Sequence, residues 1–130
     1  MSNPQFIRTI TVLPVNDIQK CYEWYGQVLG LKTVYLHEGE HESEPTNYAV
    51  LERDGIQIHL ILDELPKYGD VWTKAGTGYL YLKVNNVKEI YESAKSSGAT
   101  VSRELQKEPW GATAFNLTDP SGNSVHVEEE

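Results

Sequence analysis

The stretch "DPSGNSVHV" at residues 119–127 decides how this chain folds, because its pattern has already occurred once in the sequence. Residues 53–62, "RDGIQIHLIL", also place a glycine four positions ahead of a histidine on an apolar run. Gly55 and Gly122 are separated by 67 residues, and His59 and His126 have the same separation. A fixed separation between two similar segments indicates a duplicated structural unit.

The segments upstream of these two glycines repeat as well. Residues 10–25, "ITVLPVNDIQKCYEWY", match residues 79–94, "YLYLKVNNVKEIYESA", at an offset of 69. In both segments the apolar residues follow the i, i+3, i+4, i+7 spacing of a helix with one buried face. Asp17 and Asn86 stand where an N-cap accepts a backbone N–H from the first turn. Each half therefore reads as strand, helix and three further strands.

These repeats predict an α+β fold of two βαβββ modules within one domain, residues 1–130. Module 1 covers about 6–62, a linker covers 63–77, and module 2 covers about 78–130. The expected helices are 17–28 and 87–97, and the expected strands are 6–13, 31–37, 47–52, 56–62, 78–84, 100–106, 112–117 and 123–128. We expect a curved mixed sheet with the helices on its outer face and a concave binding crevice on the other.

Alternation along the strands assigns side chains to these two faces. Ile56, Ile58, Leu60 and Leu62 should meet the helices, as should the aliphatic residues of 79–84 and 123–128, whereas Ile61 falls on the opposite face. The opposite face then receives polar and aromatic groups: Gln57, His59, Tyr79, Tyr81, Lys83, Ser124, His126 and Glu128. A concave surface with aromatic and a few polar groups is typical of a small-molecule site.

Composition narrows the possible partners. The net charge of −8 disfavours nucleic acid, which needs clustered Lys and Arg. It favours a cationic ligand, although an acidic surface can also serve solubility alone. The single cysteine, Cys21, fits a reducing cytoplasm, and no apolar run reaches the ~20 residues of a membrane span. The N-terminus "MSNPQFIRTI" lacks the pattern of a secretory signal.

The sequence holds little that indicates nucleophilic or acid–base catalysis. "GTGYL" precedes a strand rather than opening a helix, and no Gly-x-Ser-x-Gly elbow occurs. Cys21 falls on a buried helix face. His37 and His41 belong to an acidic loop and are expected to be solvated, as is the "EEE" run at 128–130.

The pattern "TVLPVNDIQKCYEWYGQVLGL" with the terminal "DPSGNSVHV" resembles the vicinal oxygen chelate superfamily, which includes glyoxalase I, dioxygenases and bleomycin-resistance proteins. "KEPWGATAFNLTDPSGNSVHV" at 107–127 resembles the bleomycin-resistance proteins more narrowly. That resemblance implies paired βαβββ modules and a homodimer with crevices at the subunit interface. It also implies antibiotic resistance by sequestration of a cationic drug without chemical change.

The resemblance also bears on metal binding. The four positions that hold metal ligands in the superfamily's enzymes carry over to Ile10, His59, Tyr79 and His126. Ile10 cannot coordinate, and a neutral tyrosine is a poor ligand because its pKa is near ~10. We therefore expect no resident cofactor. The alternative is a divalent metal such as Zn, Ni, Mn or Fe held by His59 and His126, in a glyoxalase-like lyase or isomerase or a dioxygenase.

The remaining signal is aromatic. Trp110 stands between Pro109 and Gly111 in a loop, where a large apolar side chain is available for binding. Trp72 in the linker is a second candidate, whereas Trp24, Tyr25, Tyr48 and Phe115 are expected in the core. We predict a metal-independent, cytoplasmic small-molecule binder for a cationic or planar aromatic ligand, with neither nucleic acid nor membrane as partner. Its predicted binding residues are Trp110, Tyr79, Tyr81, Gln57, His59, His126 and Trp72.

Overall fold

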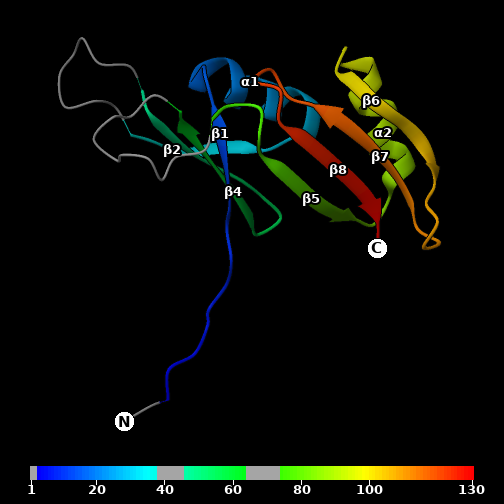
Figure 1. Ribbon diagram of the computed structural model, residues 1–130, viewed down its shortest axis with the longest axis horizontal. Helices are drawn as coiled ribbons and strands as arrows, with labels where there is room; N and C mark the ends of the chain where they lie inside the picture. Colours follow the sequence, from blue (N-terminus) through cyan, green and yellow to red (C-terminus); the bar gives the residue numbers. More distant parts are fainter. Residues whose placement is uncertain (1–2, 38–45, 64–73) are drawn as a thin grey trace.

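The computed structural model describes residues 3–37, 46–63 and 74–130. The first module consists of β1 (Thr11–Val15), α1 (Ile18–Leu29), β2 (Lys32–His37), β3 (Tyr48–Arg53) and β4 (Ile56–Leu62). The second consists of β5 (Tyr79–Val84), α2 (Val87–Ser96), β6 (Thr100–Lys107), β7 (Thr113–Thr118) and β8 (Ser124–Glu129). Figure 1 shows the two modules side by side, which confirms the predicted pair of βαβββ units.

Both modules arrange their strands in the same way. The order is β1-β4-β3-β2 in one four-stranded sheet and β5-β8-β7-β6 in the other. β1 runs parallel to β4 and β5 runs parallel to β8, whereas the other neighbouring strands are antiparallel. The duplication seen in the sequence is therefore a duplication of topology, and the sheets are mixed as expected.

The first strand is shorter than predicted. It was expected over 6–13, but β1 covers Thr11–Val15 and residues 3–10 extend away from the body of the molecule (Figure 1). Thr11 is paired with Ile58, and β4 begins only at Ile56, so the residues that precede Thr11 by more than two positions have no strand beside them. Phe6 and Ile7 are 106% and 82% exposed as a result.

The helices begin and end as local chemistry dictates. Asp17 accepts a hydrogen bond from the backbone N–H of Lys20, and Asn86 accepts one from Glu89, which confirms both predicted N-caps. α1 ends at Gly30, whose φ of 68° is the left-handed conformation that favours glycine at a helix C-terminus. Local capping thus marks the start of both helices and the end of α1.

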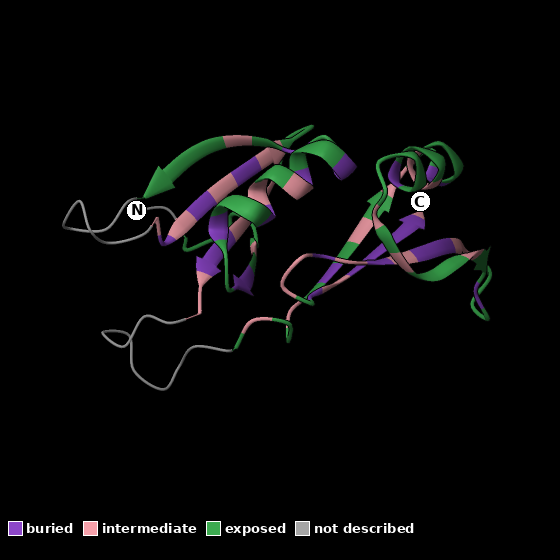
Figure 2. Cartoon of the chain, turned by 90° about the horizontal axis from the view of Figure 1, so that it is seen from above, coloured by how far each residue is buried: buried purple, intermediate pink, exposed green. Residues whose placement is uncertain are grey.

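Apolar side chains lie between each helix and its sheet. Figure 2 shows buried residues along the strands and along the helix faces that meet them. The core of both modules comprises Leu13, Val15, Ile18, Cys21, Tyr25, Val28, Leu29, Leu31, Ala49, Leu51, Ile58, Leu60, Leu80, Val87, Ala94, Phe115, Leu117, Val125 and Val127. Burial raises the pKa of the Cys21 thiol to about 11, so this cysteine packs as an un-ionised group. Tyr25 and Phe115 are buried as predicted, whereas Tyr48 is only half-buried.

The turn that opens "DPSGNSVHV" joins the modules to each other. The Asn123 side chain is fully buried, and its Nδ2 donates to the Pro14 carbonyl of β1 at 2.8 Å. Its Oδ1 accepts from the backbone N–H groups of Gly78 at 2.7 Å and Gly76 at 3.2 Å. A side chain at Gly78 would place its Cβ 2.8 Å from Asn123 Oδ1, so the chain passes too close for any residue but glycine.

Asp119 completes this junction. Its Oδ1 accepts from the backbone of Ser121 and Asn123, both at 2.9 Å, which shapes the turn. Its Oδ2 accepts from the hydroxyl of Tyr25 on α1 at 2.8 Å. Burial, reinforced by the Asp119 charge, raises the pKa of Tyr25 far above its usual range, so the phenol stays a donor. Helix α1 is thereby tied to the second module.

Within the described ranges, no helix is both long and apolar enough to cross a membrane.

Asn123→Ala should lower the free energy of unfolding by about 2–4 kcal/mol, because it leaves buried backbone groups of Pro14, Gly76 and Gly78 without partners. Urea unfolding at neutral pH measures this. Asn85→Ala, at an exposed asparagine, is the matched control and should change stability by less than about 0.5 kcal/mol. Equal stabilities for the two variants would show that the junction contributes nothing.

Candidate functional site

The face of the second sheet opposite α2 carries the candidate site. Strand alternation puts Tyr79, Tyr81 and Lys83 of β5 on this face, and the parallel register sets Tyr81 beside His126 and Lys83 beside Glu128. The aliphatic neighbours Leu80, Val125 and Val127 are buried on the other side, as predicted. This division of residues confirms the predicted faces of β5 and β8.

Trp110 reaches this face from the turn between β6 and β7. The turn is closed by hydrogen bonds from Gly111 N–H to Glu108 O and from Glu108 N–H to Ala112 O, at 2.9 and 2.7 Å. The Glu108 carboxylate is fully buried and paired with Arg103 at 2.7 Å. This ion pair holds the turn against β6, so the Trp110 indole is positioned by the sheet although it is 59% exposed.

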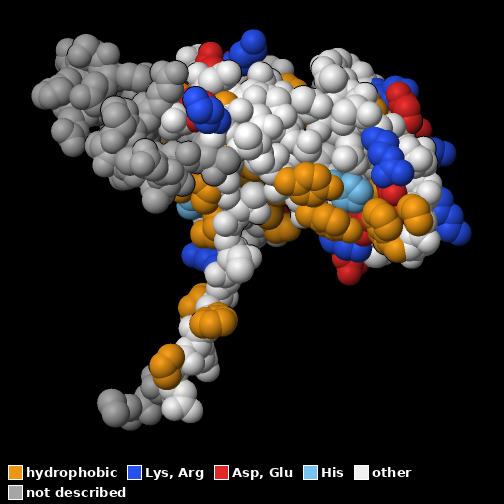
Figure 3. All heavy atoms as spheres, viewed as in Figure 1, with side chains coloured by type: hydrophobic (Ala, Val, Ile, Leu, Met, Phe, Trp, Pro, Cys, Tyr) orange, Lys and Arg blue, Asp and Glu red, His pale blue; other side chains and the backbone are white. Residues whose placement is uncertain are grey.

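Three aromatic rings surround His126. Its ring centroid is 4.6 Å from that of Tyr81 and 6.4 Å from those of Tyr79 and Trp110. Tyr79 lies nearly parallel to the imidazole, at an interplanar angle of 21°. We call these four residues the aromatic face; Figure 3 shows it as orange side chains gathered around a pale-blue histidine. Exposed, oriented rings of this kind offer stacking surface to a planar molecule.

A carboxylate, Glu128, organises the aromatic face from beneath. Its Oε1 accepts from Trp110 Nε1 at 2.9 Å and from His126 Nε2 at 3.1 Å. Its Oε2 accepts from the Tyr81 hydroxyl at 2.7 Å and from Lys83 Nζ at 2.6 Å. The expectation that Glu128 belongs to a solvated tail is wrong: these four donors cover the carboxylate and leave it 1% exposed.

The same donors fix the charge of Glu128. Hydrogen bonds from Lys83 and then Tyr81 lower the pKa of this carboxyl to about 2, because they stabilise the ionised form. Glu128 is therefore an anion throughout the physiological range, matched by the Lys83 ammonium. The pKa of Lys83 is raised by the same contact, so the lysine keeps its proton.

His126 is held as part of this network. Nε2 donates to Glu128, which can only accept, and Nδ1 lies 2.8 Å from the amide oxygen of Asn116 on β7. Both ring nitrogens are thus engaged within the protein. A metal would therefore have to displace Asn116 or Glu128 before it could bind either ring nitrogen.

His59 lies in the other sheet, on β4, with different partners. Its Nδ1 is 2.5 Å from the Tyr48 hydroxyl, and its Nε2 is 3.5 Å from the Gln57 amide oxygen. Burial, and next the charge of Arg8, lowers the pKa of His59, so its imidazole is neutral at pH 7. Gln57 and His59 therefore form a group separate from His126.

These observations do not fit a bound metal. In the described part of the chain, no three His, Cys, Asp or Glu side chains are grouped as a metal would need. Of the four positions that the resemblance implies, Ile10 is apolar and the Tyr79 ring stacks on His126, which leaves the two histidines. Two histidines are fewer than the three protein ligands that catalytic metal sites of this kind use.

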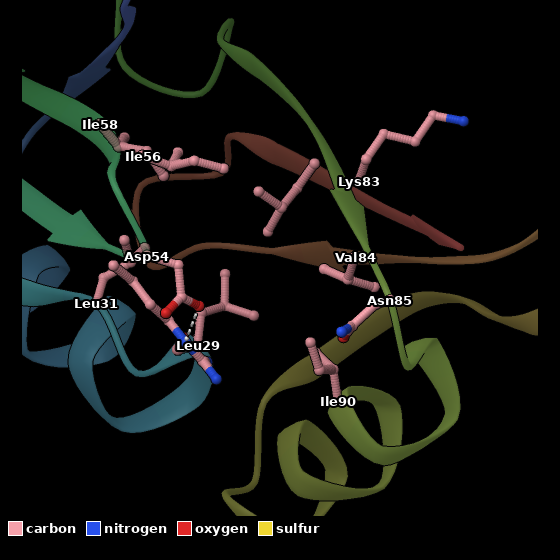
Figure 4. Close-up of a pocket in the computed structure, with 11 residues that line it drawn as sticks. Leu29, Leu31, Asp54, Ile56, Ile58, Lys83, Val84, Asn85 and Ile90 are labelled. Carbon is pink, nitrogen blue, oxygen red and sulfur yellow. Dashed lines mark hydrogen bonds and ion pairs between the residues drawn. The ribbon is translucent and has the colours of Figure 1, made fainter. Parts of the chain in front are cut away.

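Several hollows lie between the modules, and two of them are lined by residues of β5. One, of ≈ 360 Å³, brings Gln57 of the first module together with Tyr81 of the second, and its charged lining groups are Arg8 and Lys83. The other, of ≈ 340 Å³, is shown in Figure 4, where Leu29, Leu31 and Ile58 face Val84 and Ile90. It contains none of the predicted site residues, so we treat it as a gap between two cores. The first hollow extends the aromatic face toward β4.

The outcome for the predicted residues is therefore mixed. Four of them, Tyr79, Tyr81, Trp110 and His126, come together at the second sheet. Gln57 of the first module lines the same hollow as Tyr81. Trp72 and His41 lie outside the described residues. Glu128, Lys83 and Asn116 were missed as site residues, although alternation had already put Glu128 and Lys83 on this face.

Comparisons with a family model and with individual known proteins indicate the same family. The model described as "Glyoxalase/Bleomycin resistance protein/Dioxygenase superfamily" matches residues 8–127. The chain is 27% identical to a lactoylglutathione lyase of Shigella flexneri over 92% of its length and 90% of that protein. It is 26% identical to a bleomycin resistance protein of Staphylococcus aureus, over 92% of the chain and 93% of that protein.

Solved structures share the fold. TioX from Micromonospora sp. ML1 superposes with a TM-score of 0.76 at 18% identity, covering 95% of this chain and 98% of that one. A lactoylglutathione lyase from Agrobacterium tumefaciens gives 0.74 at 19% identity, covering 98% and 96%. Both support the two-module architecture and nothing finer.

The depressed pKa of Glu128 predicts a pH-dependent contribution to stability. The folded state holds the pKa of the carboxyl at about 2, against 4.5 for an unperturbed glutamate, so its contribution to stability is complete above pH 4.5 and lost as the pH falls toward 2. Glu128→Gln should therefore be less stable than the wild type at pH 7, with the difference shrinking below about pH 4.5.

Urea unfolding of both proteins between pH 7 and pH 3 tests this. Glu92→Gln, at an exposed position on α2, is the control and should follow the wild type at every pH. A Glu128→Gln deficit that stays constant with pH would mean that the carboxylate is not ionised in this network.

Proposed function

Because the chain belongs to the glyoxalase, bleomycin resistance protein and dioxygenase superfamily, we propose that it binds a small planar aromatic or cationic molecule without a metal. Binding rather than turnover is the proposed activity, so the protein acts by sequestration. An antibiotic is one ligand of this description, as the name of the Staphylococcus aureus relative suggests.

The observation that carries this proposal is the aromatic face. Tyr79, Tyr81 and Trp110 are each at least half exposed, yet their positions are set by β5, by the network of Glu128 and by the Arg103–Glu108 pair. Rings that are exposed and held in place lose little conformational entropy when a ligand stacks on them. Such preorganisation has no role in packing the core, which lies on the other side of the sheet.

The absence of a metal in the proposed mechanism rests on donor chemistry. His126 has both nitrogens engaged, and the Tyr79 ring is stacked on it. The alternative function is a metal-dependent lyase, isomerase or dioxygenase using His59 and His126. The lactoylglutathione lyase relative favours it, and the lack of a converging third donor among the described residues opposes it.

We also propose that the protein acts in the cytoplasm as a homodimer. Phe6 and Ile7 project from the body on an extended segment, and β1 and β5 are edge strands of their sheets. Exposed apolar residues beside strand edges are commonly covered by a second copy. A mass of one chain in sedimentation equilibrium would contradict this pairing.

Trp110→Ala should weaken the binding of quinoline, a planar aromatic that is uncharged at neutral pH. The loss of one stacking surface, on the order of 0.5–2 kcal/mol, corresponds to an affinity decrease of about 2- to 30-fold. Isothermal titration calorimetry measures this without depending on tryptophan fluorescence, which the substitution would itself remove.

Trp24→Phe is the matched control, because Trp24 packs edge-on against Tyr25 within α1 and should leave quinoline binding unchanged. If quinoline does not bind to the wild type, or if Trp110→Ala binds it equally well, the aromatic face is not the ligand site.

A further inference from the structure

Lys83 occupies a position that is suited to a ligand's cation. Its ammonium is 2.6 Å from Glu128 Oε2 and 6.0 Å from the centroid of the Tyr81 ring. A carboxylate beside an aromatic face is the environment in which proteins recognise organic cations. The lysine side chain is 45% exposed, so solvent reaches it from outside.

The other partners of Glu128 are held more firmly. His126 is buried and fixed at both ring nitrogens, the Trp110 indole is held by its closed turn, and the Tyr81 ring packs on the His126 ring at 4.6 Å between centroids. Lys83 reaches the carboxylate on a flexible four-carbon stem and has no second hydrogen-bond acceptor at its ammonium among the described residues. Of the four donors, it is the one that can leave without disturbing the sheet.

We propose that the Lys83 ammonium is an internal occupant of a cation subsite, and that the positive group of a bound ligand displaces it from Glu128. This rests on the proposed function, because the ligand's ring must stack on the aromatic face for its charge to reach the carboxylate. The exchange is of one cation for another, so Glu128 remains paired throughout. The displaced lysine returns to solvent.

The competition has a measurable consequence for selectivity. In the wild-type protein, a ligand's positive charge gains little, because it must replace an ammonium that is already bound. Without that ammonium, the same charge would meet an unmatched carboxylate flanked by Tyr81 and Trp110. Lys83 therefore makes the site tolerant of neutral planar molecules, and its removal should make the site selective for cations.

The test compares quinoline with N-methylquinolinium, which has nearly the same shape and a permanent positive charge. For Lys83→Met, we expect the affinity for N-methylquinolinium, relative to the affinity of the same variant for quinoline, to rise about tenfold by calorimetry. Lys88→Met, at an exposed lysine on α2, changes the net charge equally and should alter neither affinity.

Lys83→Arg is the second variant, and it tests the proposal even if Lys83→Met does not fold. A guanidinium can hold Glu128 through two hydrogen bonds, so this variant should bind N-methylquinolinium more weakly than the wild type. Near-ultraviolet circular dichroism should give the wild-type spectrum for both Lys83 variants.

Several outcomes would overturn the proposal. If Lys83→Met favours N-methylquinolinium over quinoline no more than the wild type does, Lys83 is not a competitor. If Lys83→Met instead loses quinoline-2-carboxylate, the lysine is an anchor for anions. If the wild type binds quinoline in either of these two cases, the proposed function survives and only the role of Lys83 fails. If the wild type binds neither quinoline nor N-methylquinolinium, the proposed function and the role of Lys83 both fail.

Discussion

The amide of Asn123 is the contact on which the two-module arrangement depends. Asn123 immediately precedes β8. Its amide donates to the Pro14 carbonyl of β1 and accepts from the backbone N–H of Gly78, just before β5. Asp119 holds that amide in place and accepts from Tyr25, so α1 joins the same junction. The parallel pairing of β5 with β8 begins directly after it, with Tyr79 beside Ser124. A buried, fully bonded amide of this kind fixes register, because any slip leaves its polar groups unpaired.

That register places the candidate site. Along β8, which follows Asn123, His126 is paired with Tyr81 of β5. Two residues further along, Glu128 is paired with Lys83. The carboxylate then gathers a phenol, an indole, an imidazole and an ammonium, which come from β5, β8 and the turn after β6. The fold thereby produces ordered aromatic surface outside its core. The network also uses both nitrogens of His126, one of the two histidines that the alternative metal site would need.

Most of the fold could be predicted from the sequence, whereas the predictions for the first strand and for Glu128 were wrong for physical reasons. Helix caps, buried helix faces and strand faces follow from local periodicity, and the repeat supplied the topology. The segment at residues 6–10 resembles a strand locally but finds no partner, because β4 begins too late. Glu128 sits in a run of acidic residues, and its burial depends on Lys83 and Trp110, which are distant in sequence. Such convergence is set by register and turn geometry, which residue types alone do not reveal.

We therefore propose that His126 is a wall of an aromatic binding face rather than a metal ligand. Metal analysis of protein purified without chelator or affinity tag tests this most directly, alongside a variant carrying both His59→Ala and His126→Ala. We predict less than about 0.1 equivalents of any transition metal per chain in both proteins, since too few free donors converge to hold one. Near-stoichiometric Zn, Ni, Mn or Fe in the wild type, absent from the variant, would contradict the account and point to a metal-dependent enzyme.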